Sequence, residues 1–117
     1  MYNFICYNRC TTCKKAQKWL DENNIPYAFR DIKDNPPTLE ELKKWHSLSG
    51  LPLKKFFNTS GLLYKSMELK SKLPNMTEYE MLELLSTDGM LVKRPIFVAA
   101  DFVLVGFNED LWKRKLL

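Results

Sequence analysis

Residues 2–32 read YNFICYNRCTTCKKAQKWLDENNIPYAFRDI, and this stretch decides the fold. Residues 2–7 are short, aromatic and β-branched, which is typical of a buried strand. Apolar residues recur at helical spacing in residues 12–24, and a pair of asparagines followed by a proline ends that helix. Residues 27–32 alternate as a second strand does. A strand, a helix and a strand of these lengths predict a βαβ unit with parallel strands and a right-handed crossover.

The middle of the chain is predicted to be helical. A Thr-x-x-Glu pattern at Thr38 is a capping box that starts one helix, which is expected to stop at Gly50. Residues 64–73 predict another short helix. The capping-box pattern repeats at Thr77, and Gly89 is expected as the C-cap of the helix that follows.

The C-terminal part is rich in β-forming residues, in contrast to the helical middle of the chain. Residues 96–99 and 102–105 are two β-rich runs around a two-residue turn, which indicates an antiparallel hairpin. Asn108 is expected to cap a closing helix whose last turn is basic. The resulting order of elements predicts a single α/β domain with a small mixed sheet covered by helices.

Composition narrows the function classes. Of the 117 residues, 45% are apolar and 27% are charged, as in ordinary globular domains. No apolar run approaches the ~20 residues that span a bilayer, and the N-terminus lacks the basic segment of a signal peptide. A cytoplasmic location is therefore expected. The net charge of +4 permits an anionic substrate, but no basic stripe or recognition-helix pattern indicates direct nucleic-acid binding.

All three cysteines of the chain lie within residues 6–13. Cys10 and Cys13 form a CxxC pattern between a strand and a helix, which in a reducing compartment indicates redox chemistry. Cys10 is expected near the helix N-cap, where free N–H groups and the helix dipole favour a thiolate and lower its pKa. Thr11 and Thr12 add hydroxyl donors. Cys13 would lie in the first turn, close enough to resolve a mixed disulfide at Cys10.

The cysteines and the residues near them also have other interpretations, of which zinc binding is the first. Zinc requires four ligands, and the chain offers one CxxC pair, Cys6 and a distant His46. Cys6 is expected to be a buried apolar residue of the first strand, and His46 a surface residue of a helix. Lys14 and Lys15 occupy a helix start that usually favours acids, so they either face a thiolate or oxyanion or are simply solvated.

The Arg94-Pro95 pair, just before the hairpin, has two interpretations. The proline forces Arg94 toward an extended conformation, as at an ordinary strand entry with a solvated arginine. Alternatively, the proline packs beside the thiol site, in the cis or trans form, with Arg94 directed at an anion.

The chain resembles the arsenate reductase family that works with glutathione and glutaredoxin, including its Spx branch of redox-sensing regulators. The resemblance covers nearly the whole chain and rests on five segments: CTTCKKA (residues 10–16), IPYAFRDI (25–32), LKKFFNTSG (53–61), LVKRPIFV (91–98) and VLVGFNEDLW (103–112). It implies a thioredoxin-like fold in one domain, residues 1–117, with a helical insertion at about 38–90 between βαβ and ββα halves.

The resemblance also implies roles for single residues. Cys10 matches the nucleophilic cysteine, and Cys13 matches the partner cysteine of the Spx branch. Arg94, before Pro95, matches an arginine that helps to hold the oxyanion in the reductases. Asn58 stands where those enzymes have a second oxyanion-binding arginine, and the third arginine, expected near the segment VGFNED, is absent. One guanidinium fork with lysines holds a tetrahedral oxyanion less well than three forks.

These observations predict a thiol–disulfide oxidoreductase in which Cys10 reduces arsenate or a related oxidised thiol substrate. Cys13, or glutathione with glutaredoxin, would resolve the adduct, Arg94 would stabilise negative charge, and Lys14 would help to lower the Cys10 pKa. No bound cofactor or metal is expected. The alternative is an Spx-like regulator that binds the RNA polymerase α subunit through the region around Gly50. A thioredoxin-fold scaffold without chemistry is the third possibility.

Overall fold

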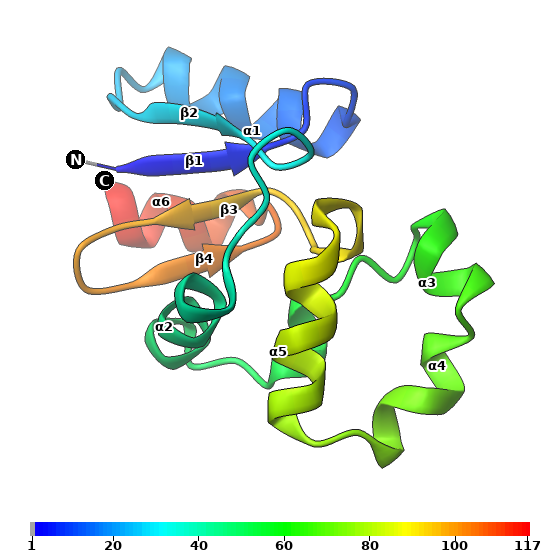
Figure 1. Ribbon diagram of the computed structural model, residues 1–117. Helices are drawn as coiled ribbons and strands as arrows, with labels where there is room; N and C mark the ends of the chain where they lie inside the picture. Colours follow the sequence, from blue (N-terminus) through cyan, green and yellow to red (C-terminus); the bar gives the residue numbers. More distant parts are fainter. Residues whose placement is uncertain (1) are drawn as a thin grey trace.

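A four-stranded mixed sheet forms the centre of the computed structural model, which describes residues 2–117. Its strands are β1 (Asn3–Cys6), β2 (Ala28–Asp31), β3 (Ile96–Val98) and β4 (Val103–Val105). The spatial order is β2-β1-β3-β4. β1 runs parallel to β2 and antiparallel to β3, and β3 and β4 form the expected antiparallel hairpin (Figure 1).

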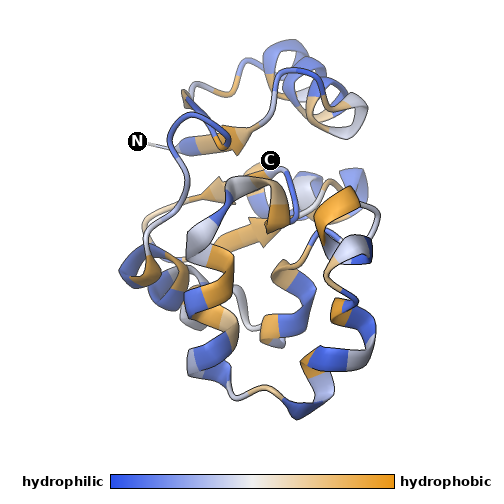
Figure 2. Ribbon diagram, turned by 45° about the vertical axis from the view of Figure 1, so that its right-hand side comes forward, coloured by the Kyte–Doolittle hydropathy of each residue, from blue (hydrophilic) through white to orange (hydrophobic). Residues whose placement is uncertain are grey.

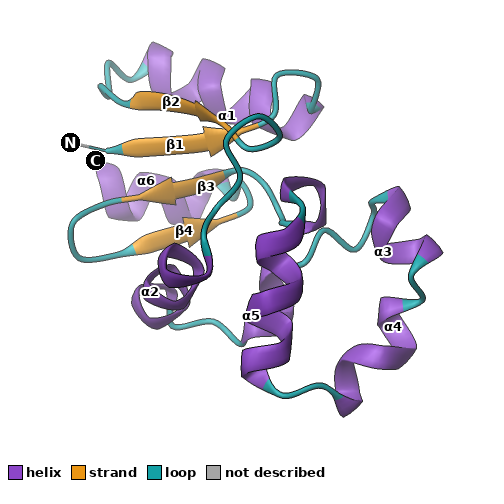
Figure 3. Ribbon diagram, in the orientation of Figure 1, coloured by secondary structure: helices purple, strands orange, loops and turns teal. Residues whose placement is uncertain are grey.

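Helices account for most of the remaining chain (Figure 3). They are α1 (Thr11–Glu22), α2 (Leu39–Ser49), α3 (Leu62–Ser66), α4 (Leu69–Lys72), α5 (Glu78–Thr87) and α6 (Glu109–Leu116), with short 3₁₀ turns at Leu53–Phe56, Leu73–Asn75 and Gly89–Leu91. Helices α2 to α5 follow β2 and precede β3. The fold is therefore the thioredoxin-like one that the sequence predicted, with a βαβ half and a ββα half around a helical segment.

The sheet separates two hydrophobic clusters, because successive strand residues point to opposite faces. Phe4 and Cys6 of β1 face α1 and α6, where fully buried Trp112 packs against Phe4 and Trp19. Ile5 faces the other way, into the cluster that includes buried residues of α2 and α5. Figure 2 shows hydrophobic residues concentrated in the strands and mixed with hydrophilic residues on the helices. The alternation thus places the Cys6 side chain on the face that α1 covers.

The predicted helix starts are confirmed. Thr38 Oγ1 accepts from the Glu41 N–H at 3.1 Å while Glu41 Oε1 accepts from the Thr38 N–H at 3.0 Å. Thr77 and Glu80 make the same reciprocal pair at the start of α5. Asn108 Oδ1 accepts from the N–H of the third residue of α6 at 3.1 Å. Each side chain satisfies a backbone donor that a helix N-terminus otherwise leaves without a partner.

Two expectations about the middle of the chain were wrong. Residues 64–73 do not form one helix, because Glu68 adopts a left-handed conformation (φ 53°) that separates α3 from α4. Gly89 is not the C-cap of α5, since α5 ends at Thr87 and Asp88 is extended. Gly89 is instead required by close packing: a Cβ at this position would collide with the carbonyl oxygen of Ile32. This contact holds the segment before β3 against the end of β2.

Candidate thiol site

Cys10 occupies the N-cap of α1, as expected. β1 ends at Cys6, and the chain turns so that the Cys10 N–H donates to the Tyr7 carbonyl at 3.0 Å. The Cys10 backbone is extended (φ −89°, ψ 124°), and its carbonyl accepts the first helical hydrogen bond, from the Lys14 N–H at 3.1 Å. Because the first N–H groups of a helix have no intrahelical partner, they are available to the Cys10 sulfur.

The surroundings of Cys10 favour its thiolate. Burial acts to raise the pKa of the half-buried Cys10 thiol, but hydrogen bonding to the Cys13 backbone N–H, to the Arg94 side chain and to the Thr12 N–H lowers it, and the net pKa lies below its ordinary value. The Arg94 charge acts in the same direction. The first turn of α1 contains no acidic residue that would oppose the effect. These groups thus shift the thiol–thiolate equilibrium of Cys10 toward the thiolate, which is the nucleophilic form.

Arg94 reaches the site through the segment that links the helical region to β3. Its peptide bond to Pro95 is cis, and Pro95 is buried at the entry to β3. The Lys93 N–H donates to the Phe56 carbonyl at 2.7 Å, and the Asn58 N–H donates to the Leu91 carbonyl at 2.8 Å. These backbone bonds tie two segments together that are distant in sequence, and they bring residue 58 to the same side of the molecule as Arg94.

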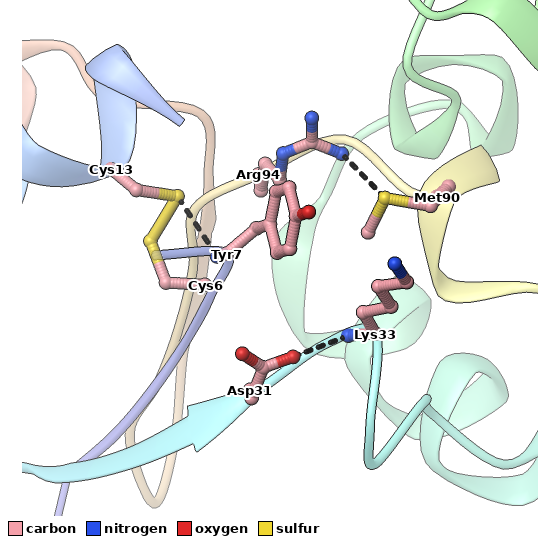
Figure 4. The surroundings of a disulfide bond; sticks show 7 residues. All are labelled: Cys6, Tyr7, Cys13, Asp31, Lys33, Met90 and Arg94. Atoms are coloured by element: carbon pink, nitrogen blue, oxygen red, sulfur yellow. Dashed lines mark hydrogen bonds between the residues drawn. A yellow bond between two sulfur atoms is a disulfide. The ribbon is translucent and has the colours of Figure 1, made fainter. Parts of the chain in front are cut away.

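The Arg94 side chain lies over the ring of Tyr7, with Cζ 5.3 Å from the ring centroid (Figure 4). Nη1 lies 4.0 Å from the sulfur of Met90. Nε is buried and has no hydrogen-bond acceptor among residues 2–117 of the protein itself, although the guanidinium is close enough to Cys10 to lower its pKa. The contact with the Tyr7 ring holds the guanidinium beside the thiol site, where its charge lowers the Cys10 pKa.

A cavity of about 810 Å³ opens at this site. Of the residues predicted for the site, it brings together Cys10, Thr12, Asn58 and Arg94. Four others do not line it: Thr11 and Lys14 are exposed on α1, and Cys13 and Pro95 are buried. Lys14 is also not among the groups that lower the Cys10 pKa. One side of the cavity therefore carries the nucleophile, and the other carries an arginine and an amide.

Sequence reasoning missed three polar residues of the cavity, Ser60, Lys93 and Asn108. Lys93 lines it directly before Arg94, and its adjacency to the Arg-Pro pair was a signal that could have identified it. Asn108 lines it as well, although the sequence indicated only its role as the N-cap of α6. A cap residue near a turn can face a cavity, but nothing in the local pattern distinguishes the caps that do.

The cysteine pairing differs from the expected one. Cys13 is bonded to Cys6 in a disulfide, and Cys10 is the free thiol (Figure 4). Cys6 is fully buried, as expected, but it is a bonding partner and not only a packing residue. The end of β1 and the first turn of α1 lie side by side in the hydrophobic cluster that contains Phe4 and Trp112. The Cα atoms of Cys6 and Cys13 lie 5.8 Å apart there, within the usual range for a disulfide. Spacing along the sequence had drawn attention to Cys10 and Cys13 alone.

Within residues 2–117, no cluster of three or more His, Cys, Asp or Glu side chains could hold a metal ion. In the same range, no helix combines the length and the apolar character that crossing a membrane requires.

The class of protein follows from the fold: a thioredoxin-like sheet with a free cysteine at the start of α1 and an Arg-Pro segment at the entry to β3. Comparison with known proteins gives the family: residues 6–114 match the model of the ArsC family, and the chain belongs to it. The match begins at the first cysteine and ends within α6.

Three relatives illustrate the range of this family. The chain is 51% identical to the uncharacterized protein YusI of Bacillus subtilis over 107 residues, which are 92% of this chain and 91% of YusI. It is 32% identical to the global transcriptional regulator Spx of Enterococcus faecalis, over 92% of this chain and 80% of Spx. The crystal structure of an ArsC-family-related protein from Bacteroides fragilis superposes with a TM-score of 0.95 at 58% identity, covering 97% of this chain and 95% of the other.

Proposed function

We propose that this protein is a thiol–disulfide oxidoreductase in which Cys10 attacks an oxidised sulfur substrate. The observation that carries the proposal is a free cysteine with a lowered pKa, at a helix N-terminus, with an arginine beside it on a cavity of about 810 Å³. Thiolate is the nucleophile in disulfide exchange, so each group that lowers this pKa increases the reactive fraction near neutral pH.

The reaction begins when the Cys10 thiolate attacks one sulfur of a substrate disulfide. A bond forms between Cys10 and that sulfur, the substrate S–S bond breaks, and the second sulfur leaves as a thiolate. Arg94 stabilises negative charge on both the attacking and the departing sulfur, because its guanidinium acts on Cys10 and lines the cavity. A second thiol then attacks the mixed disulfide and restores Cys10. Glutathione or glutaredoxin would supply that thiol. Reduced Cys13 would instead attack the Cys10 sulfur, release the bound thiol and leave a Cys10–Cys13 disulfide that an external thiol then reduces.

A disulfide is favoured over arsenate as the substrate. The predicted second arginine position holds Asn58, and the cations on the cavity are Arg94 and Lys93. Neutralising a doubly charged tetrahedral oxyanion calls for bidentate guanidinium contacts, which a lysine does not replace. The apolar residues around the polar ones, such as Leu63, Val105 and Phe107, suit a substrate with an organic body.

The test is a glutathione-coupled reductase assay that compares a glutathione mixed disulfide with arsenate under the same conditions. The mixed disulfide is expected to turn over, and Cys10→Ser is expected to abolish that turnover. Turnover of arsenate alone would overturn the choice of substrate. Turnover of neither substrate, together with a Cys10 that alkylates with the pH dependence of an ordinary thiol, would overturn the proposed function.

A second candidate is a redox-dependent regulator, favoured by the 32% identity with Spx over most of the chain. In this case oxidation of the cysteines would alter affinity for a partner, with the RNA polymerase α subunit as the first to test. The exposed end of α2, where Gly50 adopts a left-handed conformation (φ 68°), is the proposed contact. A pull-down with the α subunit, with and without oxidant, distinguishes the two candidates: redox-dependent capture without reductase turnover favours the regulator.

A further inference from the structure

We infer that the three cysteines form a relay that moves a disulfide bond from the surface to the interior. Cys10 is oxidised first, Cys13 carries the bond inward, and Cys6 enters it last, so that the bond ends in the buried Cys6–Cys13 pair. The inference rests on the proposed function, because the relay begins with an adduct at Cys10. The free thiol lines the cavity, while the disulfide partners are 0% and 3% exposed. The disulfide is therefore separated from a substrate bound at Cys10. Because Cys6 is buried, it can exchange with the Cys10 sulfur only through Cys13.

Cys13 has the position that an intermediate sulfur needs. It lies in the first turn of α1, three residues after the Cys10 N-cap, its backbone N–H helps to lower the Cys10 pKa, and its own Sγ is bonded to Cys6. The Tyr7 N–H donates to Cys13 Sγ with a nitrogen–sulfur distance of 3.3 Å, which holds this sulfur at the end of β1, next to Cys6 (Figure 4). Tyr7 also stacks under Arg94, so one residue contacts the disulfide and the group that stabilises Cys10.

The relay consists of three exchanges in which one S–S bond breaks as another forms. The Cys10 thiolate attacks the substrate disulfide, which gives a Cys10 adduct and the first released thiol. Cys13 attacks the Cys10 sulfur, which gives Cys10–Cys13 and the second released thiol. Cys6 then attacks the Cys13 sulfur, which gives Cys6–Cys13 and returns Cys10 as a thiolate. Two electrons pass from Cys6 and Cys13 to the substrate, and their two thiol protons end on the released thiols.

The environments of the three sulfurs give the last exchange its direction. Cys6 and Cys13 lie in an apolar cluster with Phe4, Leu20 and Trp112, where burial disfavours a thiolate and a neutral disulfide carries no such penalty. Arg94 and the backbone N–H groups at the start of α1 lower the Cys10 pKa and so favour its thiolate. A thiol of low pKa is also the better leaving group. The charge therefore ends at Cys10, where it is stabilised, and the disulfide ends where it is protected.

This ordering gives the relay a function that a static disulfide lacks. After the third exchange, Cys10 is free again, so the protein accepts a second oxidising equivalent while it stores the first. External thiols reach the stored pair only by reversing the path, through attack of Cys10 on Cys13 and then of the external thiol on Cys10. The buried pair would thus act as a record of oxidation that is read through Cys10.

The test treats fully reduced protein with one equivalent of glutathione disulfide, quenches with acid, alkylates the free thiols and maps the pairs by peptide mass spectrometry. Wild type is expected to release two glutathiones and to show Cys6–Cys13 with Cys10 alkylated. Cys6→Ser is expected to stop at Cys10–Cys13, and Cys13→Ser at the Cys10–glutathione adduct. In Cys10→Ser, oxidation of the buried pair is expected to be at least ~10-fold slower, because its surface entry is lost. Cys6→Ala, checked by circular dichroism, repeats the first variant with an apolar residue in the buried position.

The outcomes separate the relay from the function on which it rests. Wild type that ends as Cys10–Cys13 with Cys6 alkylated would overturn the relay. So would a Cys10→Ser variant that forms Cys6–Cys13 as fast as wild type, since the pair would then be a structural disulfide formed independently. If Cys13→Ser forms no glutathione adduct at Cys10, the thiol–disulfide function itself fails.

Discussion

The two sides of the cavity are built in different ways. The nucleophile side is one continuous stretch, residues 6–13, in which a strand end, a turn and a helix start position all three cysteines. The opposite side combines Asn58 with Lys93 and Arg94, which meet only because backbone hydrogen bonds join residues 56–58 to 91–93. Local geometry thus supplies the reactive sulfur, and tertiary structure supplies the groups that stabilise charge and bind substrate.

Removing the nucleophile is expected to have the largest effect. Cys10→Ser replaces a thiolate with a hydroxyl that stays protonated, so we expect turnover of a mixed disulfide to fall by roughly 10³-fold or more. The coupled assay measures this loss. Because Cys10 is half-buried and makes no side-chain cap bond, the variant should keep its thermal unfolding midpoint. A Cys10→Ser protein that folds and retains turnover would move the chemistry away from this side of the cavity.

Removing the charge on the opposite side comes next. Arg94→Ala deletes the guanidinium that faces Cys10, and we expect a loss of about 10²-fold in kcat/KM. Arg94→Lys is the matched control: it keeps the charge but not the fork, so it should recover only part of the loss. Equal activity of Arg94→Lys and wild type would mean that charge alone matters and that the planar geometry over Tyr7 does not.

The pH dependence connects the two sides. With Cys6 and Cys13 in their disulfide, Cys10 is the thiol that iodoacetamide can alkylate. Its pKa is lowered, so the thiolate persists at pH values where an ordinary thiol is protonated, and the rate falls only as pH drops through the lowered pKa. Arg94→Ala removes one of the groups that lower the pKa, so its rate profile should move to higher pH. An unchanged profile would assign the shift to the helix N–H groups alone.

The contrast between the two sides also explains what the sequence could predict. The βαβ unit, both capping boxes, the hairpin and the Cys10 N-cap depend on neighbours a few residues apart, and all of them were recognisable from local patterns. The split at Glu68 was not, because a left-handed residue other than glycine or asparagine has no clear sequence signal.

The cysteine pairing shows the limit more sharply. The CxxC spacing pointed to Cys10 and Cys13, which are near each other in any helix start. The Cys6 side chain meets Cys13 only because side chains alternate along β1 and because α1 packs on the face of the sheet to which Cys6 points. Lys93 and Asn58 likewise depend on the pairing of distant segments. Resemblance had indicated the position of Asn58, but not that Lys93 would accompany it.

Asn58 provides a smaller test of the opposite side. Its amide lines the cavity and is uncharged, so Asn58→Ala should raise KM by about 5-fold, the effect of one net hydrogen bond, with little change in kcat. Asn58→Asp keeps the shape but adds a negative charge, and it should weaken binding of an anionic substrate further. Steady-state kinetics with the glutathione mixed disulfide measure both. If neither variant changes KM, the amide does not contact the substrate.

The smallest effects are expected for two lysines near the cavity, Lys93 and Lys14. Lys14 follows the cysteines in sequence but is exposed outside the cavity, whereas Lys93 lines it next to Arg94. We expect Lys93→Ala to raise KM by about 3-fold, in line with one partly screened charge contact, and to lose this effect at high salt. Lys14→Ala should change KM by less than about 2-fold and should leave the pH profile of Cys10 alkylation at its wild-type position. The opposite ranking would show that the basic start of α1 binds substrate, and that proximity in sequence to the cysteines was the better guide.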